Sequence, residues 1–212
     1  MLTVNDLQEV LQAATHPLDR AVITTLAKTG IGVGELCNLA VEDVQLPDGY
    51  GGRFTEVIPN HIPLLRIRYG GDLPYNNRRE RKGTTYIPID GELAYVLKRW
   101  LSVRPDPRDG SPLFVSTREQ WGPRISQHVA QSILKNHGET VGLYEEGSEM
   151  ENLTPYSLRY FFEERFAGQP VVREYLLGRR TDINWSLEEI ATHYQRHIFN
   201  LGLPRQIDYI EI

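Results

Sequence analysis

The sequence predicts a mainly helical α+β domain that contains a small three-stranded sheet. Apolar residues recur at helical spacing over much of the 212-residue chain. Between residues 53 and 90 the pattern changes to short runs rich in β-branched residues, and helical spacing then returns. With 40% hydrophobic and 24% charged residues, the composition fits one globular domain with a proper core.

The N-terminal part is expected to hold three helices. Residues 3–14 form the first, because Thr3 or Asn5 can cap it and apolar residues follow at spacings of three and four. Residues 17–29 form the second, which begins at a proline and stops at Gly30. A short third helix is expected around residues 34–40.

The middle of the chain is expected to form the sheet. Residues 56–58, 64–68 and 84–89 are predicted as short strands. A basic loop joins the last two strands, since residues 66–82 contain six basic and two acidic side chains, a balance of +4. Asp90 then caps a helix with a clear apolar face.

The C-terminal part is again expected to be helical. The predicted helices span residues 125–137, 155–167, 170–177 and 187–199. Loops at 47–52 and 104–112 are candidate boundaries, but the pieces beside them are too small to fold alone. We therefore expect a single domain over residues 1–212.

Composition excludes several classes of protein. The net charge of −5 argues against a uniformly basic nucleic-acid binder, although it leaves room for a local basic face. The single cysteine, Cys37, excludes an intramolecular disulfide and a cysteine-based zinc cluster. No apolar run approaches the length of a membrane span, and the N-terminus lacks the pattern of a signal peptide.

Four stretches, in this order, carry a family resemblance. They are TGIGVGELCNLAVEDV at 29–44, the basic turn ending at Lys82, TPYSLRYFF at 154–162, and YLLGRR at 175–180 followed by THYQRH at 192–197. Together they resemble the catalytic domain of the tyrosine recombinase (phage integrase) family. The resemblance implies that family's fold, with an antiparallel sheet. It also implies that the family's N-terminal clamp domain is absent or lies on a longer parent chain.

The family's chemistry is what the resemblance implies for the site. A tyrosine attacks a DNA phosphodiester and forms a 3′-phosphotyrosine, while two arginines bind the non-bridging oxygens. A lysine protonates the leaving oxygen, and histidines assist. By position in the motifs, Tyr194 matches the nucleophile, Arg159 the second arginine and Lys82 the lysine. No metal or other cofactor is implied.

The chain also departs from the family pattern. Gly32 stands at the first arginine, Tyr156 at the first histidine and Arg179 at the second histidine or tryptophan position. Tyr194 lies 16 positions after Gly178, several more than is usual in the family. Losing one charged clamp typically costs ~10³–10⁵ in the rate of phosphoryl transfer. The resemblance therefore implies reduced or lost strand transfer, with Arg179 as a partial replacement for the missing arginine.

Each of these residues has a structural alternative. Tyr194 lies on an apolar helical stripe and could be a core residue. Arg159 could pair with Glu163 one turn later. Arg179 and Arg180 could simply cap the preceding helix at its C-terminus, where cations are favoured.

Double-stranded DNA is the expected partner. The candidate backbone contacts are Arg66, Arg68, Arg78, Arg79, Arg81 and Arg180. The alternative for the basic loop is a solvated turn. Because family members exchange C-terminal segments between protomers, the resemblance also implies self-association. His193 and His197 lack the HExxH pattern, so we expect no metal site.

Three functions stay open on the sequence alone. The first is an active recombinase that forms an adduct through Tyr194. The second is a degenerate relative that binds DNA or a partner without cutting, as a regulator or accessory protein. The third is a helical interaction domain with no DNA role. The departures at Gly32, Tyr156 and Arg179 favour the second, and we expect a cytoplasmic protein of prokaryotic, archaeal or viral origin.

Overall fold

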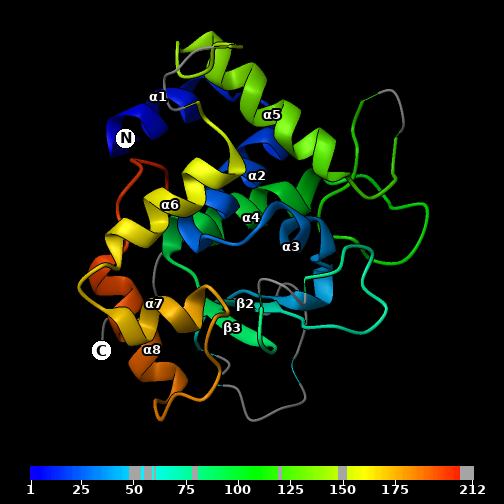
Figure 1. The fold of residues 1–212 in the computed structure, drawn as a ribbon. Coiled ribbons are helices and arrows are strands. Elements are labelled where there is room, and N and C mark those ends of the chain that lie inside the picture. Colours follow the sequence, from blue (N-terminus) through cyan, green and yellow to red (C-terminus); the bar gives the residue numbers. More distant parts are fainter. Residues whose placement is uncertain are drawn as a thin grey trace.

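The computed structural model describes residues 1–47, 54, 59, 61–77, 81–118, 121–147 and 152–205. The elements follow the order α1 (Val4–Ala13), α2 (Pro17–Thr29), α3 (Val33–Asn38), the 3₁₀ turn η1 (Val41–Asp43), β1 (Val44–Gln45), β2 (Leu64–Ile67), β3 (Thr85–Pro88), α4 (Gly91–Val103), α5 (Gln127–Thr140), α6 (Pro155–Arg165), α7 (Pro170–Leu176) and α8 (Leu187–His197). The predicted mainly helical α+β fold is confirmed (Figure 1).

Helix α2 is the centre of the helical part (Figure 1). Nearly all of its residues are buried, and α1, α3, α4, α5 and α6 pack against it. Its N-terminus carries Pro17 in the first turn, and its C-terminus ends at Gly30 in the left-handed conformation. A β-carbon on Gly30 would lie 2.4 Å from the Phe162 ring, so α6 can approach α2 closely only because this residue is glycine.

The sheet contains three antiparallel strands in the order β1-β2-β3. The central strand pairs Leu65 with Val44 on one side and with Ile87 on the other. The predicted strands at 64–68 and 84–89 are present as β2 and β3, whereas the predicted strand at 56–58 falls outside the described residues. β1 therefore supplies the third strand. Helices α7 and α8 pack beside β3 (Figure 1).

A buried group of charges joins α2, α4 and the chain after α8. Lys28 has no exposed surface, and its ammonium donates to Asp90, to Glu92 at 2.6 Å and to the Phe199 carbonyl at 2.8 Å. We call Lys28, Asp90 and Glu92 the Lys28 cluster. The buried ammonium thus makes three hydrogen bonds, two of them to carboxylates. Without these partners, burying its charge would cost folding free energy.

The Lys28 cluster also holds the end of the described chain. The backbone N–H groups of Leu201 and Leu203 donate to the Glu92 carboxylate at 2.8 and 2.9 Å. Up to Leu203, the chain after α8 therefore packs on its own domain. The part of the segment proposed for self-association that follows residue 205 lies outside the described residues.

The single cysteine, Cys37, is buried. Burial raises the pKa of its thiol to about 12, although the positive charge of Arg124 lowers that pKa by a smaller amount. Across the described ranges, no helix is long and apolar enough to cross a membrane.

Candidate active site

A cleft of about 730 Å³ gathers most of the residues picked out by motif. It is lined by residues 32–35 of α3, by 76–77 and Lys82 from the β2–β3 connection, by Gln127 and Gln131 of α5, by 154–156 and Arg159 of α6, and by Arg179 after α7. The cleft therefore brings Lys82, Tyr156, Arg159 and Arg179 together with Gly32. Tyr194 is not among its lining residues.

Gly32 lies at the cap of α3, at the edge of the cleft. Its φ of −71° is ordinary for any residue, so the backbone does not require glycine here. Its N–H donates to the Glu35 carboxylate at 2.9 Å, which closes the first turn of the helix. The position contributes no charge to the cleft.

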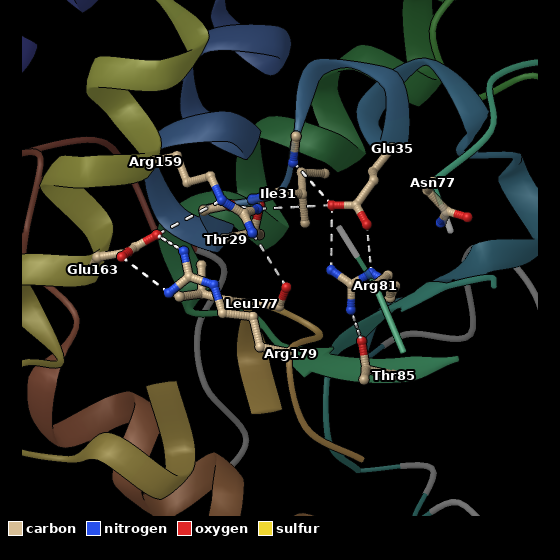
Figure 2. Close-up of polar contacts among 12 residues, drawn as sticks. Thr29, Ile31, Glu35, Asn77, Arg81, Thr85, Arg159, Glu163, Leu177 and Arg179 are labelled. Atoms are coloured by element: carbon tan, nitrogen blue, oxygen red, sulfur yellow. Dashed lines mark hydrogen bonds and ion pairs between the residues drawn. The ribbon is translucent and has the colours of Figure 1, made fainter. Parts of the chain in front are cut away.

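Arg159 is held by backbone carbonyls at the inner wall of the cleft. Its Nη1 donates to the Gly30 carbonyl at 2.7 Å and its Nη2 to the Leu177 carbonyl at 3.3 Å. Glu163 lies 3.8 Å from its Nε, and Glu35 lies 4.0 Å from its Nη1 (Figure 2). The side chain is 14% exposed. Its position is thus determined by the C-terminus of α2 and the turn after α7.

Arg179 lies opposite Glu163 and forms a bidentate pair with it (Figure 2). The two contacts, from Nη2 and Nη1, measure 2.5 and 3.2 Å, and Glu174 lies 3.5 Å from Nη1. Burial alone would lower the pKa of Arg179, but the bonds and charges of Glu163 and Glu174 outweigh it and raise that pKa. The guanidinium expected to replace the missing arginine is therefore charged and already paired.

Lys82 and Arg81 are neighbours with opposite exposure. The Lys82 side chain is exposed at the cleft, and its backbone N–H donates to the Gly178 carbonyl at 2.7 Å. Arg81 is fully buried, with its Nε 2.5 Å from the Glu35 carboxylate and Nη1 donating to Thr85 (Figure 2). The expectation that Arg81 contacts DNA is corrected here: its guanidinium is enclosed by Glu35, Thr85 and the turn at Gly178.

Tyr194 is buried completely in the core. Its hydroxyl donates to the Lys28 carbonyl at 2.9 Å, and its ring stacks on Phe166 with the centroids 6.1 Å apart. Burial, together with the charges of Asp90 and Glu92, raises the pKa of this hydroxyl well above its usual value. In this conformation the hydroxyl is directed into the Lys28 cluster, as the core alternative for its helical stripe predicted.

Of the remaining predicted residues, one lines the cleft, three form ion pairs elsewhere, and two fall outside the described residues. Tyr156 lines the cleft and is 78% exposed. Arg66 and Arg68, half-buried on and beside β2, pair with Asp43 at 2.9 and 3.0 Å. Arg180 is exposed and lies 3.2 Å from Asp182. Arg78 and Arg79 fall outside the described residues.

Several residues in or beside the cleft carry no motif. Glu163, beside the cleft, is expected from the sequence only as an i+4 partner of Arg159, whereas its shorter contacts are with Arg179. Glu35 and the amides of Asn77 and Gln127 carried no sequence signal for this role. In the part of the chain that the structure describes, no group of three or more His, Cys, Asp or Glu side chains could hold a metal ion.

The fold around this cleft is that of tyrosine recombinase and integrase catalytic domains. Residues 1–168 match the model of the Phage integrase family, and the chain therefore belongs to that family. The matched region contains α1 to α6 and ends ahead of α7 and α8. The family resemblance of the motifs is confirmed.

Two curated relatives show how the chain compares in length. Tyrosine recombinase XerA of Pyrococcus horikoshii is 28% identical over 196 residues, which cover 90% of this chain and 55% of the relative. Tyrosine recombinase XerC of Thermodesulfovibrio yellowstonii is 27% identical over 208 residues, 91% of this chain and 57% of the relative. The chain thus spans a little more than half the length of these archaeal and bacterial proteins.

Solved structures share the fold at lower identity. The crystal structure of XerA recombinase matches with a TM-score of 0.62 at 21% identity. The match covers 94% of this chain and 63% of the XerA chain. XerH bound to difH substrate in a pre-cleavage complex has a TM-score of 0.59 at 17% identity, covering 91% and 49%. A lambda integrase tetramer bound to a Holliday junction has a TM-score of 0.54 at 18% identity, covering 87% and 48%.

Proposed function

We propose that this domain binds double-stranded DNA across the cleft, as a site-specific recombination protein whose strand-cleavage activity is reduced or lost. The observation that supports DNA binding is the convergence of Lys82, Arg159 and Arg179 on one cleft. Guanidinium and ammonium groups are the usual protein partners of the DNA backbone. XerH and lambda integrase, which share the fold, were both solved on DNA.

Reduced cleavage follows from two positions. Gly32 offers no cation where the family uses its first arginine, so charge developing on the phosphate oxygens loses one stabilising partner. Tyr194 donates its hydroxyl to a backbone carbonyl inside the core, and a phenol with a raised pKa is a poorer nucleophile. Attack by Tyr194 would require α8 to leave the Lys28 cluster.

A covalent-trapping experiment tests this proposal. The full chain is incubated with a pool of nicked duplexes whose central segment is randomised, and adducts are separated on denaturing gels. Mobility shifts at two salt concentrations measure binding. We expect salt-dependent binding by the wild-type protein and no adduct.

The variants separate the remaining outcomes. A wild-type adduct that disappears in Tyr194→Phe would show an active recombinase and overturn the proposed loss of cleavage. An adduct formed only by Gly32→Arg, and absent from its double variant with Tyr194→Phe, would show that the missing arginine limits catalysis. Absence of binding to every duplex at low salt would favour the helical interaction domain.

Self-association through the C-terminal segment is part of the same proposal. The lambda integrase neighbour is a tetramer on its junction substrate. Sedimentation with and without DNA would test assembly here, and a truncation after residue 205 would test the segment itself. A monomer at every concentration, with and without DNA, would contradict it.

A further inference from the structure

Glu163 lies between the two arginines of the cleft and contacts both (Figure 2). It sits one helical turn after Arg159 on α6, so both side chains face the same side of that helix. Its Oε1 is 2.5 Å from Arg179 Nη2 and 3.8 Å from Arg159 Nε, and its Oε2 is 3.2 Å from Arg179 Nη1. One carboxylate therefore bridges α6 and the turn after α7.

The carboxylate occupies the Nη1–Nη2 edge of Arg179, one of the two edges at which a guanidinium binds a phosphate in bidentate fashion. A carboxylate and a phosphodiester each present two oxygens at similar spacing. One edge of a guanidinium can donate two parallel hydrogen bonds to only one of these groups at a time. We infer that Glu163 competes with the DNA phosphate for Arg179 and so lowers the affinity of the cleft for DNA. This inference rests on the DNA binding proposed above.

Arg159 does not need Glu163 to stay in place. Its two Nη atoms donate to the carbonyls of Gly30 and Leu177, which belong to buried backbone on either side of the cleft. Arg179 differs, since its side chain is held by the carboxylates of Glu163 and Glu174. Neutralising Glu163 should therefore release Arg179 while Arg159 keeps its orientation.

The charge balance of the cleft points the same way. Lys82, Arg159 and Arg179 carry three positive charges at the cleft, and their partners Glu163 and Glu174 carry two negative ones. Glu35 also lines the cleft, but Arg81 offsets its charge, so the balance is +1. Replacing Glu163 by glutamine leaves +2. Each additional phosphate that a protein neutralises releases counterions and steepens the dependence of affinity on salt.

The pair is also accessible enough to exchange partners. Glu163 is 21% exposed and Arg179 40% exposed at their side chains. Ion pairs at this exposure contribute little to folding, so the glutamine variant should stay folded. Glu164, the next residue, is exposed, whereas the carboxylate that contacts both arginines is that of Glu163. Glu164→Gln is therefore the matched control with an equal change of charge.

The test is a salt titration of DNA affinity with wild type, Glu163→Gln and Glu164→Gln on one nicked duplex. For Glu163→Gln we expect an affinity gain of about 3- to 10-fold at low salt, with the log–log salt slope steeper by about one. Glu164→Gln should gain less than about 2-fold and keep the wild-type slope. Equal behaviour of the two variants would overturn the inference, and so would weaker binding by Glu163→Gln.

A second measurement keeps the inference independent of the proposed function. The arginine Nε–H resonances are followed by NMR while inorganic phosphate is added to the full chain. Arg179 should respond at lower phosphate concentration in Glu163→Gln than in Glu164→Gln. If no duplex binds but this difference is found, the DNA proposal fails and the competition stands. If the two variants titrate alike, the competition is overturned.

Discussion

The Lys28 cluster and the cleft contain the same kinds of side chain in opposite surroundings. The ammonium of Lys28 and the carboxylate of Glu92 have no exposed surface, and three segments of chain meet at them. At the cleft, Arg179 and Glu163 remain partly exposed and join α6 to the turn after α7. The free-energy cost of burying a charge explains why the two regions differ. A fully buried charge must keep its ion-pair partner, whereas a partly exposed charge can exchange its partner for water or a ligand.

This comparison separates stability from function. The Lys28 cluster holds α2, α4 and the segment after α8 together, so its residues should matter chiefly for folding. The cleft residues are held by a few carbonyls and carboxylates, so they should matter chiefly for binding. Tyr194, which the sequence motif matches to the family's nucleophile, belongs to the first region, because its hydroxyl donates to the Lys28 carbonyl.

The largest effect is expected for Lys28→Met. Removing the ammonium leaves Asp90 and Glu92 buried beside each other without their cation, and loss of one partner from a buried pair costs about 3–5 kcal/mol. Urea denaturation would measure the change in the free energy of unfolding. Lys135→Met, which removes an exposed ion pair with Glu146, is the control and should leave stability unchanged. Equal losses in the two variants would erase the distinction between the regions.

A medium effect is expected for Tyr194→Phe. The Lys28 carbonyl loses its hydroxyl donor inside the core, which costs about 1 kcal/mol at neutral pH. The raised pKa of Tyr194 stabilises the folded state fully below pH ~10, where an unfolded tyrosine begins to ionise, and this contribution disappears as pH rises further. The stability difference between wild type and variant should therefore shrink above pH ~10. A difference that widens there would mean that the hydroxyl is not shielded as the structure shows.

The smallest effect on stability is expected for Arg179→Gln. A partly exposed pair contributes about 0–1 kcal/mol, so thermal unfolding should barely change. DNA affinity tests the comparison better than stability does, because Glu163→Gln should no longer raise DNA affinity once Arg179 is absent. The double variant should bind DNA like Arg179→Gln alone. If the double variant still bound DNA more tightly than Arg179→Gln, Glu163 would act through Arg159 or through the overall electrostatic potential of the cleft.

Local signals predicted most of the helices. Thr3 forms a capping box with Asp6, Asp90 caps α4, and Gly30 ends α2, each where the residue type favours it. The first strand was the weakest part of the prediction. β1 contains only two residues, which is too short for an alternating pattern to register.

The site was predictable in its positions and less so in its contacts. The motifs picked out Lys82, Tyr156 and Arg159, which the structure brings together in one cleft. They also picked out Tyr194, which lies in the core instead. The burial of Arg81 depends on Glu35, which is 46 residues away, and no local pattern encodes such a pair. Pairs of that kind depend on how the elements pack together.

Cys37 makes this chain convenient for chemical labelling. A buried thiol with a pKa of about 12 is a thiolate in fewer than about one molecule in ten thousand near neutral pH. Maleimide and iodoacetamide reagents should therefore leave the native protein unmodified. A cysteine introduced at an exposed site, such as Glu164→Cys, would accept a fluorophore selectively and report on DNA arriving at the neighbouring cleft.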